Sequence, residues 1–118
     1  MIYELREYVA HPHAVHQVHD RFATATLPLF ERHGLTVTGF WVDQNHPHRI
    51  LYLLEFPDAD ARSRAWQQFQ DDPEWKQVKA ASESSGPIVA EMTSRTLQAV
   101  DYWPSADSAG AGAEGASR

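Results

Sequence analysis

Histidine is the residue type in this chain best suited to moving protons near neutral pH. The chain has seven histidines among 118 residues, and four of them fall between positions 11 and 19. His19 lies about 40° around an expected helix from Val15, at the border of an apolar stripe. It can therefore project into a cavity between helix and sheet and act as a general acid or base, which makes it a candidate catalytic residue. The alternative is a boundary histidine that hydrogen-bonds a backbone carbonyl.

The histidines around His19 have spacings that could also suit a metal ion. His16 lies three residues before His19 and four before Asp20, so either pair can meet on one helix face. Together with His13 such a pair could hold zinc or copper. However, the HExxH signature is absent, and a solvated polar face explains the same residues equally well. We therefore assign no metal ligand among these histidines, His11 included, and metal binding by them stays an alternative hypothesis.

Two other polar residues are candidates for a site. His33 precedes Gly34 at the expected end of a helix, where it can line the open end of a pocket as a second catalytic residue. Alternatively, it pairs with the last helix carbonyls and the helix dipole. Arg6 and Glu55 lie within expected strands, where a buried charge needs a partner, so they can pair across the sheet or across a dimer interface. Arg6 can instead anchor an acidic or enolic substrate group.

The aromatic residues supply a surface that suits a flat, hydrophobic ligand. Most of them are expected to be core, because aromatic side chains dominate the cores of small proteins. We predict that Trp41 and Tyr52 form walls of a pocket. The predicted substrate-binding residues are these two together with Tyr3 and Arg6. The aromatic residues considered are Tyr3, Tyr8, Trp41, Tyr52, Trp66 and Trp75.

Several classes of chemistry are excluded or disfavoured by composition. The chain has no cysteine, so it has neither a disulfide framework nor a thiolate nucleophile. GxSxG and GxGxxG are absent, and we expect no cofactor. A formal charge of −6 argues against nucleic-acid binding. No apolar run is long enough to cross a membrane and no signal-peptide pattern is present, so we expect no membrane association and a cytoplasmic location.

The hydrophobic periodicity predicts the elements that must position these residues. Alternating residues indicate strands, and apolar residues three and four apart indicate helices, with a kink or break at Pro28. Asp58 and Asp72 are expected to cap two helices, Pro73 being the first residue of the second. The expected order is a strand over 2–9, a helix from 13 to Gly34, strands over 35–42 and 49–56 joined by a loose loop, helices after 58 and 72, and a strand over 91–100.

This order predicts a ferredoxin-like α+β fold, βαββαβ, with a four-stranded antiparallel sheet and helices on one face. Leu51 and Leu53 lie on one face of their strand, although a sheet covered on one side should alternate apolar with polar residues. Because the chain is too short to cover a second face itself, we predict a homodimer packed sheet to sheet. The opposite face of that strand carries Ile50, Tyr52, Leu54 and Phe56.

Six short blocks, in order along the chain, resemble the NIPSNAP family. The resemblance runs from residue 1 to about 104 and implies a dimeric α+β barrel, in which two ferredoxin-like subunits pack their sheets together. We therefore divide the chain into a domain over 1–104 and a small, polar, disordered tail over 105–118. The blocks are MIYELR with Tyr8, Leu27-Pro28, Glu31-Arg32-His33-Gly34, Gly39-Phe40-Trp41, Asp72-Pro73-Glu74-Trp75, and Asp101-Tyr102 with Pro104.

The resemblance implies several activities rather than one, because a fold does not fix a function. The wider superfamily includes cofactor-free monooxygenases acting on aromatic polyketides, cyclases, lactone isomerases and haem-handling proteins. Our first hypothesis is a small-molecule enzyme of the cofactor-free monooxygenase, cyclase or isomerase type, acting on a flat hydrophobic substrate. The second is a non-catalytic module that binds a small hydrophobic or aromatic ligand or a partner. The third is a histidine-dependent metal or haem site.

Overall fold

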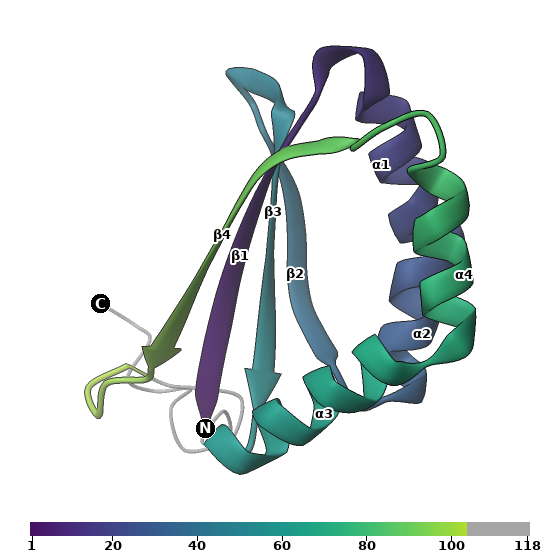
Figure 1. Cartoon of the computed structure of the whole chain (residues 1–118). Helices are drawn as coiled ribbons and strands as arrows, with labels where there is room; N and C mark the ends of the chain where they lie inside the picture. Colours follow the sequence, from purple (N-terminus) through teal and green to yellow (C-terminus); the bar gives the residue numbers. More distant parts are fainter. Residues whose placement is uncertain (104–118) are drawn as a thin grey trace.

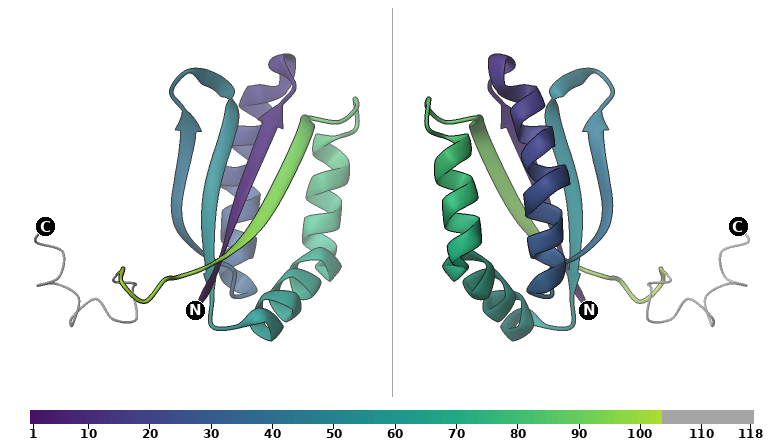
Figure 2. Two further views of the ribbon diagram at one scale, coloured as in Figure 1. Left: turned by 90° about the vertical axis from the view of Figure 1, so that its left-hand side faces the viewer. Right: turned by 90° about the vertical axis from the view of Figure 1, so that its right-hand side faces the viewer.

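The computed structural model describes residues 1–103, which form an antiparallel four-stranded sheet in the order β2-β3-β1-β4. All helices lie against one face of this sheet (Figures 1 and 2). The predicted ferredoxin-like α+β class is therefore confirmed, whereas the predicted tail over 105–118 lies outside the described residues. The elements are β1 (Ile2–Ala10), α1 (Val15–Arg21), α2 (Leu27–Arg32), β2 (Thr36–Asp43), β3 (His46–Phe56), α3 (Ala59–Asp71), α4 (Pro73–Ser82) and β4 (Val89–Gln98).

The central strands β1 and β3 direct alternate residues toward the helices. Arg6 pairs with Tyr52 across the strands, and Tyr8 pairs with Ile50. Because side chains alternate between faces along a strand, Glu4, Arg6 and Tyr8 share the helix-covered face. The β3 residues on this face, Ile50, Tyr52, Leu54 and Phe56, are at most 1% exposed.

The first helical segment is one irregular helix from Pro12 to Arg32. A short 3-10 turn begins it, and a π-helical turn over Phe22–Thr26 separates α1 from α2. Pro28 has no N–H to donate to the carbonyl of Thr24, and the wider turn is closed by the N–H of Leu27 on the carbonyl of Phe22. The break expected at Pro28 thus takes the form of a π-turn just before it, and the helix continues. The helix ends at Arg32, and Gly34 follows it with a φ of 78°, a conformation that favours glycine.

The caps predicted for the second helical segment are confirmed. The Asp58 carboxylate accepts a hydrogen bond from the N–H of Ala61 at 2.8 Å, and the Asp72 carboxylate accepts one from the N–H of Glu74 at 2.8 Å. Pro73 is the first residue of α4, where its missing N–H costs no helical bond. The cap at Asp72 separates α3 from α4, and the chain changes direction between them (Figure 1).

The hairpin between β2 and β3 is tighter than the loose loop expected from its sequence. Asp43 already pairs with His46, so the turn consists of Gln44 and Asn45. The N–H of Asn45 donates to the Asp43 carboxylate at 2.8 Å, which closes the turn locally. The strand β3 consequently begins three residues earlier than expected, with Pro47 at the edge hairpin, where no ladder hydrogen bond is needed from it.

The second sheet face carries apolar side chains and is not covered by any helix of residues 1–103 (Figure 2). We call it the open sheet face. Trp41 on this face is 54% exposed, and its ring lies over Gly39, at a place where a Cβ would clash. The strand register places these further apolar side chains on the face: Tyr3, Leu5, Val9, Leu51, Leu53 and Leu97. No helix of the described residues is long and apolar enough to cross a membrane.

Candidate functional site

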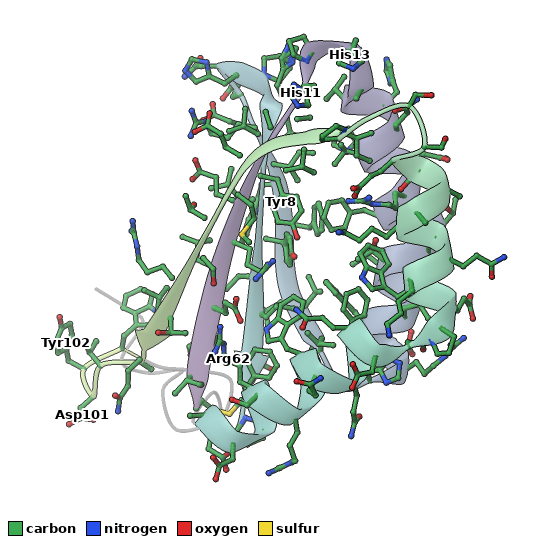
Figure 3. The ribbon with its side chains drawn as sticks, in the orientation of Figure 1. Tyr8, His11, His13, Arg62, Asp101 and Tyr102 are labelled. Atoms are coloured by element: carbon green, nitrogen blue, oxygen red, sulfur yellow. The ribbon has the colours of Figure 1, made fainter. Side chains whose placement is uncertain are left out.

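A cavity of about 560 Å³ lies between the helix-covered sheet face and the helices. Six of its lining residues are aromatic, which suits a flat ligand, and its volume is in the range of small-molecule sites. Arg6 and Tyr8 contribute from β1 and Met92 from β4. In Figure 3 the Tyr8 side chain points from the sheet toward the helices. The start of β4 also contributes Val89, and the helices and the loop before β4 contribute Arg21, Phe22, Thr26, Phe30, Trp66, Phe69, Gln70, Trp75, Lys76, Lys79, Glu83, Pro87 and Ile88.

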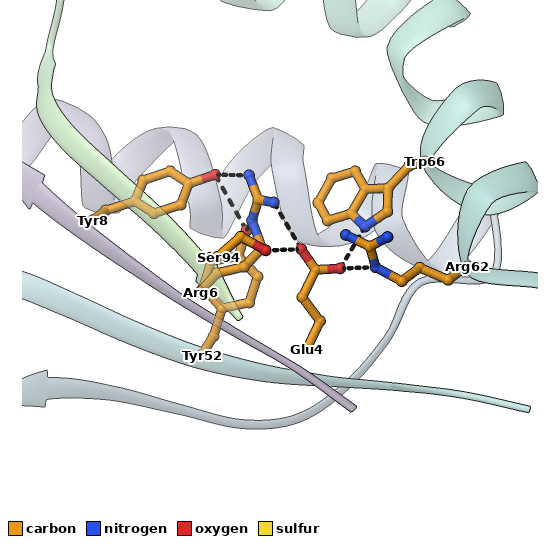
Figure 4. A network of polar contacts seen from close by, with 7 residues as sticks. All are labelled: Glu4, Arg6, Tyr8, Tyr52, Arg62, Trp66 and Ser94. Atoms are coloured by element: carbon orange, nitrogen blue, oxygen red, sulfur yellow. Dashed lines mark hydrogen bonds and ion pairs between the residues drawn. The ribbon is translucent and has the colours of Figure 1, made fainter. Parts of the chain in front are cut away.

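The Glu4 side chain is fully buried and does not line the cavity, but its carboxylate accepts hydrogen bonds from residues that do (Figure 4). Arg62 donates to Oε1 at 2.7 Å and Trp66 donates to the same oxygen at 2.8 Å. Arg6 donates to Oε2 at 2.9 Å, and Ser94 donates to it at 2.5 Å. One carboxylate therefore joins β1, β4 and α3.

These hydrogen bonds decide the ionisation of Glu4. Burial disfavours the charged carboxylate, but the hydrogen bonds from Arg62, Ser94, Trp66 and Arg6 outweigh burial and lower the pKa of Glu4 from 4.5 to about 2. A buried carboxylate is stable in its charged form only when it is paired and hydrogen-bonded in this way. Glu4 is therefore a fixed counter-charge for Arg6 rather than a group that exchanges protons near neutral pH.

Arg6 links this network to two tyrosine hydroxyls. Its Nε donates to the Tyr52 hydroxyl at 3.0 Å and its Nη2 to the Tyr8 hydroxyl at 3.2 Å, and the two hydroxyl oxygens lie 3.2 Å apart. Burial raises the pKa of Tyr52 well above its usual value, so this hydroxyl is neutral. The guanidinium also stacks over the Trp66 ring, with its central carbon 4.4 Å from the ring centroid.

Arg6 and Tyr8 can therefore present donors to an oxygen atom inside the cavity. The three hydrogen bonds of Arg6 use three of its guanidinium N–H groups, which leaves about two for a ligand. A cation and a hydroxyl, fixed in place beside aromatic walls, favour a substrate oxygen that carries negative charge. An enolate or phenolate oxygen has this character.

A second arginine lies on the helix side of the cavity. Arg21 is 8% exposed and donates from Nη1 to the Ser82 hydroxyl and to the Glu83 carboxylate, each at 3.0 Å. Its guanidinium carbon lies 5.2 Å from the centroid of the Trp75 ring. These contacts join α1 to the end of α4 and hold Trp75 in the cavity wall.

The comparison with known families now decides the identity of the domain. The family model for NIPSNAP matches residues 3–104, which is most of the chain. The chain is a member of the NIPSNAP family. No curated protein matches it in sequence.

Solved structures agree with this assignment at the level of fold. A NIPSNAP domain protein from Burkholderia xenovorans has a TM-score of 0.77 at 16% identity, over 89% of this chain and 100% of that one. A NIPSNAP-like domain protein from the same organism has a TM-score of 0.76 at 18% identity, over 88% and 89% of the two chains. A variant of SnoaB, a cofactor-independent oxygenase from Streptomyces nogalater, has a TM-score of 0.61 at 16% identity, over 83% and 91%.

Two of the blocks on which the NIPSNAP resemblance rests meet in space through His33. Its Nε2 lies 2.7 Å from Oδ2 of Asp72, which also accepts a hydrogen bond from Arg32 at 3.1 Å. The hydrogen bond to His33 is the main cause that lowers the pKa of Asp72 from 3.8 to about 2. Neither expectation for His33 describes this contact, because its ring pairs with a carboxylate at the α3–α4 junction and is not among the cavity-lining residues.

The other predicted site residues of this NIPSNAP protein separate into two groups. Arg6 lines the cavity, and Tyr52 lies directly behind it with its hydroxyl bonded to Arg6. Tyr3 and Trp41 lie on the open sheet face, so Trp41 is not a wall of this cavity. His19 borders a shallow surface depression with His16 and Asp20, and the expected projection of His19 into the cavity between helix and sheet is wrong.

The remaining histidines lie away from the cavity as well. The rings of His11 and His13 stack 5.6 Å apart at the end of the molecule where β1 leads into the helix (Figure 3). Among residues 1–103, no three histidine, aspartate or glutamate side chains come together as a metal-binding group.

Sequence reasoning missed most of the network around Glu4. The alternation of β1 places Glu4, Arg6 and Tyr8 on one face, and this signal was available in the sequence. The helix and β4 partners of Glu4 lie 58 to 90 residues away along the chain, and no local pattern predicts their approach. The lining residues Arg21, Lys76 and Lys79 belong to no recognisable sequence motif, so the sequence did not indicate them as site residues.

Proposed function

We propose that this NIPSNAP protein is a cytoplasmic, homodimeric small-molecule enzyme that oxygenates flat, enolisable aromatic substrates without a cofactor. The observation that carries the proposal is the pairing of Arg6 with Tyr8 in the wall of an aromatic cavity. The similarity in fold to a cofactor-independent oxygenase makes this class of reaction the natural one to test. A module that binds a ligand without turnover is the alternative outcome of the same test.

In the proposed reaction the substrate supplies the electrons. An enolisable ketone loses a proton from carbon to solvent water, and Arg6 and Tyr8 stabilise the resulting enolate oxygen by donating hydrogen bonds to it. The enolate carbon then forms a bond to dioxygen, and the peroxide loses water to leave a new carbonyl group. For anthrone the balance is one anthrone and one dioxygen giving one anthraquinone and one water. The aromatic side chains hold the ring system flat.

Dimerisation through the open sheet face belongs to the same proposal. A row of apolar side chains on this face, including Leu5, Leu51 and Leu53, has no cover within residues 1–103. Exposed apolar patches of this kind mark interaction surfaces in soluble proteins. A second copy of the chain offers the same surface, so a two-fold axis would cover both faces at once.

The role of Tyr8 leads to a direct prediction. With anthrone as substrate, Tyr8→Phe is expected to lower the rate of oxygen uptake about a hundredfold, because one donor to the enolate oxygen is lost. Oxygen uptake is measured with an oxygen electrode, and the rate in protein-free buffer is subtracted. Tyr3→Phe is the matched control, since Tyr3 lies on the open sheet face outside the cavity.

The two variants separate the possible outcomes. Equal rates for the wild type and Tyr8→Phe would contradict the role of this hydroxyl. Binding of anthrone without oxygen uptake above the buffer rate would contradict oxygenation and favour the ligand-binding module.

A further inference from the structure

The positive charge of the cavity is unusual for so acidic a chain. The whole sequence has a formal charge of −6 and only two lysines, Lys76 and Lys79. Both lysines are exposed residues of α4, and both line the cavity. The other charged lining residues are Arg6, Arg21 and Glu83, so four cations face one carboxylate.

The two arginines already have counter-charges, whereas the lysines do not. Arg6 pairs with Glu4 at 2.9 Å, and Arg21 pairs with Glu83 at 3.0 Å. Within residues 1–103 neither lysine forms an ion pair. The excess of positive charge therefore comes from α4. Charges of one sign beside low-dielectric walls concentrate the field inside a cleft and attract ligands of opposite sign.

The two kinds of cation occupy different walls. Arg6 lies in the sheet wall, where its side chain is 13% exposed, and the lysines lie on α4, which runs along the side opposite the sheet (Figure 1). The lining residues also include Trp66 of α3, whose ring lies against the Arg6 guanidinium, and Trp75 of α4. A ligand that uses both walls has an oxygen at Arg6, a flat ring system between the aromatic side chains, and a negative group at α4.

From this arrangement we propose that the substrate is a flat aromatic acid whose carboxylate is held by Lys76 and Lys79. This inference names the substrate class for the cavity and rests on the proposed function. The alternative is that the two lysines, which are exposed and lie three residues apart on one face of α4, only solvate that face, and the experiment below separates the two cases.

The test compares two ligands that differ only in charge. Anthracene-9-carboxylate and anthracene-9-carboxamide have the same ring system, and their dissociation constants are measured by isothermal titration calorimetry at pH 7 and low salt. The carboxylate is expected to bind about tenfold more tightly, and this advantage shrinks as potassium chloride is added.

Variants that remove one lysine charge test whether the lysines cause the tighter binding of the carboxylate. Lys76→Gln and Lys79→Gln are each expected to weaken carboxylate binding about threefold and to leave carboxamide binding unchanged. Arg64→Gln is the control, because Arg64 is an exposed residue of α3 that does not line the cavity. Thermal unfolding of each variant verifies that the fold is intact.

Each outcome has a distinct meaning. Equal binding of the two ligands to the wild type would overturn the inference and leave the aromatic cavity of the proposed function standing. An equal loss of both ligands in the lysine variants would also overturn it, because charge would not be the cause. Absence of binding by either ligand would overturn the proposed function, and this inference with it.

Discussion

Glu4→Gln is expected to lower the free energy of unfolding at pH 7 by about 3 kcal/mol, because it removes the buried counter-charge of two arginines. In the wild type, the carboxylate of this fully buried side chain accepts hydrogen bonds from Arg6 and Arg62. Urea denaturation followed by circular dichroism measures the change. The control is Glu74→Gln, since Glu74 pairs with Arg32 at an exposed position and is expected to contribute under about 1 kcal/mol. Equal losses in the two variants would contradict the central role of Glu4.

The pH dependence of stability gives a second measurement on the same residue. The pKa of Glu4 is depressed from 4.5 to about 2 in the folded state, so its stabilisation is fully present above pH 4.5. The stabilisation is lost as the pH falls from 4.5 to about 2, because the unfolded state binds the proton first. Glu4→Gln is expected to flatten the stability curve over this interval. Some slope remains, because the pKa of Asp72 is also lowered to about 2.

Leu53→Asp is expected to convert the proposed homodimer into a monomer, with the dimer dissociation constant raised about a thousandfold or more. Leu53 lies on the open sheet face, opposite Leu5, and a two-fold interface would bury the new carboxylate twice without a partner. Sedimentation velocity at micromolar protein concentration measures the change. Because Leu53 points away from the helix-covered core, the monomer is expected to keep its circular dichroism spectrum.

A matched control distinguishes the interface from a general effect of charge. Ser63→Asp places the same carboxylate at an exposed position of α3, away from the sheet, and is expected to leave the dimer intact. A wild-type chain that sediments as a monomer would refute the proposed dimer. Dissociation by Ser63→Asp to the same extent would show that Leu53 is not at a specific interface.

The sequence was a good guide wherever local periodicity decides the structure. The alternation of Glu4, Arg6 and Tyr8 placed them on one strand face, and Asp58 and Asp72 were recognisable as helix caps. Local chemistry was sufficient in these cases, because strand alternation and capping depend on only a few neighbouring residues. The order of the elements followed from the same patterns.

Local periodicity was insufficient where an irregularity shifts the register. The β2 strand has a bulge between Val37 and Gly39, so Val37 and Trp41, which strict alternation would place on one face, lie on opposite faces. Trp41 therefore reaches the open sheet face rather than the cavity. His19 precedes the π-helical turn and faces a surface depression, which its angle from Val15 alone did not predict. Long-range partners such as Arg62 and Ser94 needed the three-dimensional structure.

The Asp72 carboxylate does not line the cavity, but its contacts fix the relative position of two helices that do. One oxygen caps α4, and the other holds His33 and Arg32 at the end of α2. The distance between these helices at this end is thus determined outside the binding surface, by an ion pair rather than by the aromatic walls. Substitutions in the cavity walls can therefore change the binding surface of this chain while the spacing of the helices that carry them stays the same.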